Sequence, residues 1–249
     1  MPDIIVHTGM GREVLSRLGL RLNADVYRFG LLGPDPFLFY RFYVPPFWHA
    51  ANRYSSVMHR ERTGDFLAAL ALRCREEPEL FAYLAGFLCH YALDSAAHPF
   101  ILRKANHSRT MHMAIEHRLD TLYGGEIDIP PFLPERLKAG VGGCIGAVYG
   151  WSDAWEKLQQ GHADMFPFYR LAGDRNGTLN RLLGCVGASA LSYRSRLCDS
   201  MDLSGFWPLY RKAVGDACVF IPAAEAFVRG ETTEEQFRSV VGSRSYIDG

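Results

Sequence analysis

The stretch "GFLCHYALDSAAHPF", residues 86–100, places three ionisable side chains in a mainly apolar run. His90, Asp94 and His98 are spaced four residues apart, so on a helix all three lie on one face. A buried carboxylate is costly unless it is paired or binds a metal. The stretch therefore predicts a core helix that carries either a hydrogen-bonded polar cluster or a metal site.

Helix geometry limits how these three side chains could share metal ions. His90 and His98 would lie about 12 Å apart along a regular helix axis, whereas zinc binds its ligands at about 2 Å. One ion therefore cannot be held by both histidines. His90 and Asp94 could hold one ion while Asp94 bridges towards another. Pro99 is expected to end the helix and to turn His98 to a separate position.

A second helix, expected over residues 110–124, carries a similar pair. His112 and Glu116 lie four residues apart in "HMAIEHRLD", whereas His117 points about 100° away from them. A histidine and a carboxylate at this spacing offer two ligands to one cation. Asp120 continues the same face and is either part of this set or a solvated acid.

Three further candidate ligands precede these two helices. His7 lies in the first ten residues, Asp35 is held between two prolines in "GPDP", and His59 precedes a helix. Judged alone, Asp35 would be an ordinary turn aspartate and His59 a surface histidine. Their order relative to the two helices is what makes them candidates for a metal site.

Helical periodicity dominates the rest of the chain, and strand-like runs are few. The expected fold class is all-α: a single-domain multi-helix bundle over residues 1–249 with a metal-binding cleft. Further helices are expected over residues 62–77, 78–98, 134–150, 177–201, 206–230 with a break near Pro222, and 232–241 with a capping-box-like start.

The segment 28–48 is rich in glycine and proline and predicts a rigid loop. Seven of the twelve residues from Phe37 to Trp48 are aromatic. These side chains either pack beneath the loop or form an apolar lip that meets a lipid or another organic substrate.

Composition narrows the classes of partner. Lys and Arg number 27 and Asp and Glu also number 27, so the basic surplus of a nucleic-acid-binding protein is absent and no long nucleic acid is expected. The most apolar window, residues 80–89, is shorter than the roughly 20 residues of a membrane span. The first residues lack a signal-peptide pattern, so a cytoplasmic location and six free structural cysteines are expected.

Taken together, the candidate ligands follow a defined order: His7, Asp35, His59, His90-x3-Asp94, His98 and His112-x3-Glu116. This order resembles that of the zinc-dependent phospholipase C family, whose relatives include the single-strand-specific zinc nucleases. The "GPDP", "CHYALDSAAHPF" and "HMAIEHRLD" segments are most similar, and the resemblance covers roughly residues 1–120. It implies a mostly helical fold with a three-zinc cleft.

The resemblance also implies how the ligands divide among the ions. One ion falls to His98, His112 and Glu116, and a second to Asp35, His59, His90 and Asp94. A third ion would be held by His7, by the amino terminus and by Asp94, which would bridge two ions. Two features depart from the secreted members: the Asp94-to-His98 gap is shorter, and the sequence starts Met1-Pro2 instead of with tryptophan. Two or three zinc ions per chain are therefore expected.

The expected function is that of a metal-dependent phosphoester hydrolase with phospholipase C-type cleavage of a phosphodiester. Its substrate would be a small molecule or a phospholipid, with transient contact to a membrane surface, and Asp35 would be a metal ligand or a water-orienting base. One alternative is a phosphodiesterase or nuclease on the same metal frame. Another is a non-catalytic helical protein stabilised by metals, which predicts closed coordination.

Overall fold

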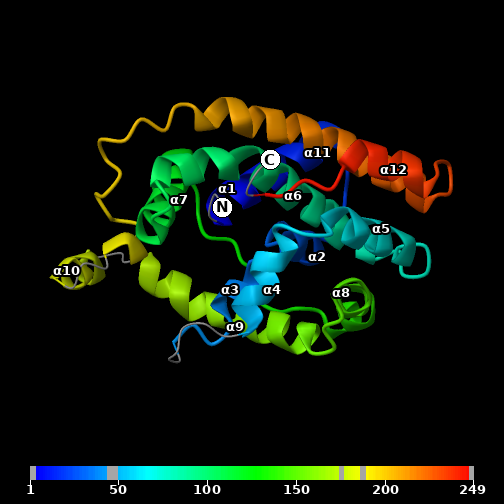
Figure 1. The fold of residues 1–249 in the computed structure, drawn as a ribbon, viewed down its shortest axis with the longest axis horizontal. Coiled ribbons are helices and arrows are strands. Elements are labelled where there is room, and N and C mark those ends of the chain that lie inside the picture. Colours follow the sequence, from blue (N-terminus) through cyan, green and yellow to red (C-terminus); the bar gives the residue numbers. More distant parts are fainter. Residues whose placement is uncertain (1–3, 44–49, 174–176, 186–188, 247–249) are drawn as a thin grey trace.

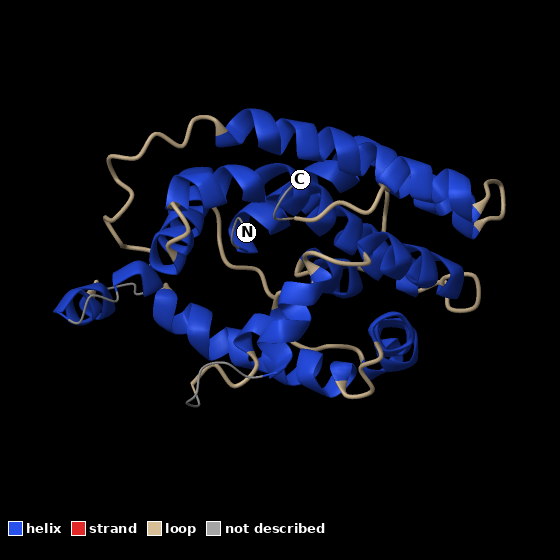
Figure 2. Ribbon diagram, in the orientation of Figure 1, coloured by secondary structure: helices blue, strands red, loops and turns tan. Residues whose placement is uncertain are grey.

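The computed structural model describes residues 4–43, 50–173, 177–185 and 189–246, and within these ranges it contains helices and no strand (Figures 1 and 2). The prediction of an all-α fold is confirmed. The helices are α1 (Ile4–Leu18), α2 (Ala24–Leu31), α3 (Pro36–Phe39), α4 (Ala50–Met58), α5 (Thr63–Arg73), α6 (Leu80–Ala105), α7 (Arg109–Tyr123), α8 (Gly143–Tyr149), α9 (Ala154–Ala172), α10 (Thr178–Cys185), α11 (Phe206–Val228) and α12 (Glu234–Val241). Three short elements are η1 (Glu135–Leu137), the π-helical η2 (Lys138–Gly142) and η3 (Ser189–Leu191).

Helix α6 forms the centre of the bundle, and α1, α2, α5, α7 and α11 pack against it (Figure 1). Its 26 residues are long and apolar enough to cross a membrane, but 89% of the apolar window is buried inside the protein. The apolar composition is therefore explained by the neighbouring helices, and α6 is a core helix.

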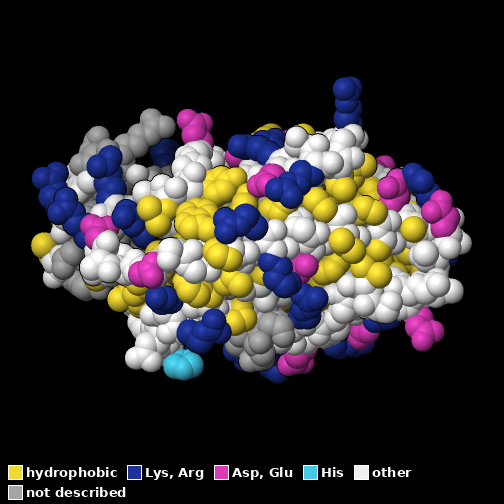
Figure 3. Space-filling model, turned by 90° about the horizontal axis from the view of Figure 1, so that it is seen from above, with side chains coloured by type: hydrophobic (Ala, Val, Ile, Leu, Met, Phe, Trp, Pro, Cys, Tyr) yellow, Lys and Arg dark blue, Asp and Glu magenta, His cyan; other side chains and the backbone are white. Residues whose placement is uncertain are grey.

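The outward side of α11 shows hydrophobic side chains mixed with Lys and Arg (Figure 3).

The prediction that α6 ends at Pro99 is wrong. A proline inside a helix removes one hydrogen bond and crowds the preceding turn, yet α6 continues to Ala105 and stops at Asn106 in a left-handed conformation, with φ 47°. Beyond the proline, Ile101 and Ala105 are buried in the core. Their packing outweighs the cost of the proline, so His98 keeps its helical position.

Other boundaries also differ from the sequence expectations. Helix α11 runs through Pro222 without a break, because its inner side is buried while Pro222 faces outward. One long helix was expected over 177–201, but the described part of this segment contains only the short α10 and η3. The segment 28–48 was expected to be a loop, but its described part contains the end of α2 and all of α3. Helices α1, α4 and α9 were not expected. The capping box that opens α12 and the six free cysteines are confirmed.

Two glycines allow α2 to lie directly on α6. A Cβ atom on Gly30 would lie 2.2 Å from the carbonyl oxygen of Tyr83, and one on Gly86 would lie 2.2 Å from that of Tyr27. Both separations are far shorter than van der Waals contact, so no larger residue fits this crossing. The close approach brings the carbonyl of Leu31, at the end of α2, within hydrogen-bond distance of His90 on α6.

We expect the Gly86→Ala substitution to lower the free energy of unfolding by about 1–3 kcal/mol, because the added methyl group must push α2 away from α6. Chemical denaturation of the purified protein measures this change. The matched control is Gly215→Ala on α11, where a Cβ atom meets nothing within 4 Å. That control should be neutral or slightly stabilising, and equal stability of the two variants would contradict the close-packed crossing.

Candidate metal centre

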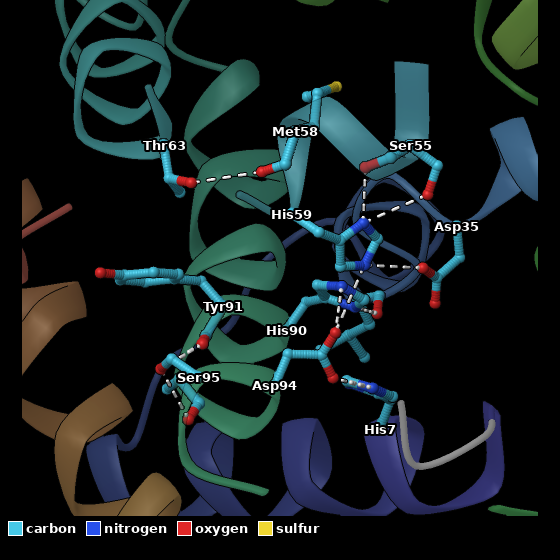
Figure 4. Close-up of polar contacts among 12 residues, drawn as sticks. His7, Asp35, Ser55, Met58, His59, Thr63, His90, Tyr91, Asp94 and Ser95 are labelled. Atoms are coloured by element: carbon cyan, nitrogen blue, oxygen red, sulfur yellow. Dashed lines mark hydrogen bonds and ion pairs between the residues drawn. The ribbon is translucent and has the colours of Figure 1, made fainter. Parts of the chain in front are cut away.

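The carboxylate of Asp94 lies at the centre of a buried cluster of histidines (Figure 4). Its Oδ1 is 3.2 Å from Nε2 of His7, and its Oδ2 is 3.5 Å from Nε2 of His59 and 3.3 Å from Nε2 of His90. Nε2 of His59 is also 3.3 Å from Oδ1 of Asp35. Side chains from α1, α6, the loop before α3 and the residue after α4 therefore meet around one carboxylate.

Backbone carbonyls orient two of these histidines. Nδ1 of His59 donates to the carbonyl of Ser55 at 2.7 Å, and Nδ1 of His90 donates to the carbonyl of Leu31 at 3.1 Å. The Nε2 atom of each ring then faces the carboxylates (Figure 4). This arrangement, in which one ring nitrogen is held and the other is presented, is typical of histidines that bind metals.

Several buried atoms in this cluster, among the described residues, have no hydrogen bond beyond the 3.2–3.5 Å contacts that they make with one another. They are Nε2 of His7, Nε2 of His90, Oδ1 of Asp35 and both oxygens of Asp94. Buried polar atoms are normally hydrogen-bonded. An imidazole and carboxylate donor set of this kind suits zinc, so the residues present fit a metal ion better than a closed network of hydrogen bonds.

A second group of possible ligands lies between α6 and α7. Nε2 of His112 is 2.6 Å from Oε1 of Glu116, and the rings of His98 and His112 are 4.9 Å apart in an edge-to-face arrangement. The ring of His98 is also 6.3 Å from that of His59, which joins this group to the Asp94 cluster. Three sets have ligand atoms within 4.8 Å of one another: His7, His90 and Asp94; Asp35, His59 and His90; His98, His112 and Glu116.

The position of Asp35 depends on the glycine two residues before it. Gly33 has φ +53°, a conformation that favours glycine. A Cβ atom on Gly33 would lie only 2.3 Å from Cδ2 of His90. The loop can therefore pass directly over the imidazole of His90 and deliver Asp35 to the first turn of α3, where Pro36 follows it.

Asp120 anchors the helix that carries His7. The structure buries Asp120 completely, and its two carboxylate oxygens each accept a backbone N–H from the first turn of α1, from Ile5 and from Val6, at 2.9 Å. Tyr193 donates to the same carboxylate at 3.1 Å. A negative charge at a helix N-terminus is stabilising. Asp120 is therefore neither a solvated acid nor one of the grouped ligands.

All eight residues that the sequence singled out as candidate ligands come together in the structure. Little in the sequence indicates the residues that orient them, namely Gly33 and the carbonyls of Leu31 and Ser55. Of these, only the glycine follows a recognisable pattern, because it lies in the glycine- and proline-rich segment. His7, in the first ten residues, is buried in the first turns of α1.

The electrostatic environments of the two groups differ. Burial lowers the pKa of His59, but the carboxylates of Asp35 and Asp94 outweigh this effect and raise that pKa to about 9. Burial opposes ionisation of Asp94, yet the surrounding histidines hold the pKa of this carboxyl well below its usual range. In the second group, burial lowers the pKa of His98 and lowers that of His112 to about 3.

The helical fold brings together three neighbouring sets of histidine and carboxylate side chains that could hold metal ions. Comparison with protein-family models identifies the family: residues 6–145 match the model described as zinc dependent phospholipase C. The match covers more than half of the chain and includes all eight candidate ligands. The chain belongs to this family, whose activity is metal-dependent phosphodiester hydrolysis of phospholipids. No match was found among curated proteins or among solved structures.

The different pKa values lead us to expect that the two groups take up zinc with different pH dependence. Below about pH 9 the His59 imidazole carries a proton that zinc must displace. His112, with a pKa of about 3, is already neutral near pH 6. Zinc affinity at the His59 group should therefore fall about tenfold for each unit of pH below 9, while the His112 group changes little.

Zinc titrations of the metal-free protein at about pH 6, 7 and 8 measure this difference. The His112→Ala variant serves as the comparison, because it removes the group with the weaker pH dependence. It should keep the His59 group, whose affinity rises with pH. Equal affinities at all three pH values in this variant would contradict the proposed proton displacement.

Proposed function

We propose that this chain uses two or three zinc ions to hydrolyse the phosphodiester bond on the glycerol side of a phospholipid. Family membership supports the reaction class. The observation that carries the assignment to particular residues is Asp94, which is fully buried and lies 3.2–3.5 Å from nitrogens of three different histidines. A carboxylate in this position can be shared by two ions.

The ligands are divided in this proposal according to the three sets in the structure. His98, His112 and Glu116 hold one ion. Asp35, His59 and His90 would hold a second, and His7 and Asp94 would hold a third beside His90. When bound, the ions supply positive charge that stabilises the phosphoryl oxygens and lowers the pKa of an attacking water.

The accessibility of the two groups favours an enzyme over a protein that uses metals only for stability. The side chains of His90 and Asp94 are 0% exposed, whereas those of His112 and Glu116 are 21% and 16% exposed. A structural zinc site is closed, whereas a catalytic site keeps a position open. Substrate is therefore expected to approach from the side of α7.

We assign to Asp35 the role of orienting the attacking water. Its side chain is 13% exposed, and with His7 it lines a small cavity of about 10 Å³ between α1, α2 and α9. This volume is close to that of one water-sized sphere. Asp35 can thus orient a water and accept its proton as the oxygen of that water adds to phosphorus. The bond between phosphorus and the glycerol oxygen then breaks, and the protonated Asp35 returns the proton to the departing glycerol oxygen.

The aromatic segment is partly core and partly surface in the described residues. Phe37 is buried, and Phe39 and Phe42 pack against Phe168 of α9, with ring centroids 5.0 and 5.6 Å apart. Leu38 and Tyr43 are 38% and 57% exposed. Phe47 and Trp48, which were also expected in an apolar lip, lie outside the described residues. The exposed side chains support contact with a lipid surface.

We expect the Asp94→Asn substitution to remove at least one zinc equivalent and nearly all hydrolysis while keeping the helical fold. Asparagine has the same size but lacks the charge that two ions would share. Bound zinc, hydrolysis of short-chain phospholipid and of chromogenic phosphodiesters, and thermal unfolding are measured on this variant. If Asp94 were only a hydrogen-bonded core residue, zinc content would stay unchanged and stability would fall by about 1–3 kcal/mol.

Asp164→Asn is the matched control for removing a buried negative charge. Asp164 is 5% exposed and accepts the backbone N–H of Arg41, outside the three ligand sets. This variant should keep the full zinc content.

A nucleotide phosphodiester cleaved faster than any phospholipid by the unmodified protein would contradict the lipid substrate and favour the nuclease alternative.

We expect the Tyr43→Ser substitution to reduce hydrolysis of phospholipid in vesicles but not of dispersed short-chain phospholipid. An aromatic side chain that enters the lipid surface contributes about 1–2 kcal/mol, so the rate on vesicles should fall about five- to thirtyfold. The control is Val219→Ser on α11, because Val219 is similarly exposed, at 58%. Equal losses in the two variants, or equal losses on both forms of substrate, would contradict a lipid-binding role for Tyr43.

A further inference from the structure

The segment that follows α12, residues 242–246, crosses three elements that surround the metal centre. Ser243 Oγ accepts the backbone N–H of Gly64 on α5 at 3.2 Å, and the N–H of Arg244 donates to the hydroxyl of Tyr91 on α6 at 2.9 Å. The N–H of Tyr246 then donates to the carbonyl of His59 at 2.8 Å. These bonds fix the segment to the protein and end at a candidate ligand.

The side chain of Tyr246 lies against the candidate ligands themselves. It is completely buried, and its ring centroid is 4.9 Å from that of His59, with an interplanar angle of 76°, and 6.0 Å from that of His90. The ring of Tyr91 supports it from the other side at 5.4 Å. One aromatic ring thus contacts two imidazoles that come from different parts of the chain.

These contacts complete the orientation of the two imidazoles. The Nδ1 atoms of His59 and His90 are fixed by hydrogen bonds to carbonyls, and Nδ1 of His59 also lies 3.2 Å from Oγ of Ser55. Contacts at one ring atom still allow the ring to tilt about that atom. A rigid ring packed against both imidazoles removes this freedom. Outer-shell groups that orient metal ligands through hydrogen bonds typically change metal affinity by about 10- to 100-fold when they are replaced, and we expect a change of the same order here.

We infer that Tyr246 is a positioning residue of the metal centre: its buried ring holds the imidazoles of His59 and His90 in the geometry that binds zinc. Residue 246 lies far outside the 6–145 region that matches the family model. In this chain the C-terminal segment therefore completes a site whose ligands all lie in the first half of the sequence. The inference rests on the metal binding that the proposed function requires, but not on the identity of the substrate.

The test is the Tyr246→Ala substitution, measured by zinc affinity in competition with a chromophoric chelator and by the absorption spectrum of the cobalt-substituted protein. Zinc affinity should fall about 10- to 100-fold, and the cobalt bands should shift because the imidazoles tilt. Tyr246→Phe keeps the ring and should retain both properties of the unmodified protein. Should the alanine variant fail to fold, Tyr246→Leu, which fills much of the volume without a planar ring, gives the same comparison.

The matched control is Phe237→Ala on α12. Phe237 is equally buried, but its ring stacks on Phe227 and not on a histidine. This control should lower stability and leave zinc affinity and the cobalt spectrum unchanged. Unchanged zinc affinity in both the Tyr246→Ala and Tyr246→Leu variants, or an equal loss in Phe237→Ala, would overturn the inference. Because no substrate is used, absence of phospholipid hydrolysis in the unmodified protein would overturn the proposed function alone.

Discussion

The fold depends on the cost of burying the charge of Asp94. This carboxylate is fully buried in the central helix α6, and an uncompensated charge in such a place would cost several kcal/mol. The compensation cannot come from α6 alone, because only His90 lies within reach on the same helix. Helix α1 and the residue after α4 must therefore approach α6 closely, and the crossing helices around the centre are arranged so that they do.

Metal binding explains why the compensation takes the form of histidines and a second carboxylate. Lysine or arginine would neutralise Asp94 as well, but would leave no nitrogen lone pair to offer to an ion. The histidines instead present Nε2 atoms at 3.2–3.5 Å from Asp94, where they can form an ion pair or bind zinc. The same residues thus stabilise the buried charge in the metal-free protein and prepare the site for the ion.

The sequence predicted the candidate ligands better than it predicted the elements that carry them. Spacing of four residues is a local signal, so the faces of α6 and α7 could be read directly, and the order of ligands indicated the family. Helix α1 was missed because residues 4–11 are all buried and show no polar face. Pro99 and Pro222 were misread because packing against neighbouring helices, which is not encoded locally, outweighs the cost of a proline.

The residues that position the ligands were less predictable, because their roles also depend on packing between distant parts of the chain. Gly33 and Gly86 matter because another chain segment passes within contact distance of their Cα atoms. Asp120 and Tyr246 matter because of partners more than 110 residues away in sequence. Such roles depend on contacts between distant segments, which no single stretch of sequence indicates.

Helix α7 has one further consequence, because it takes part in the site at both of its ends. Its first half carries His112 and Glu116, and its second half carries Asp120, which holds the start of α1 and hence His7. A displacement of α7 would therefore move ligands of both groups, because its start carries two of them and its end holds the helix that carries a third. The two groups of ligands are thus tied to one helix, whose position sets the distance between them.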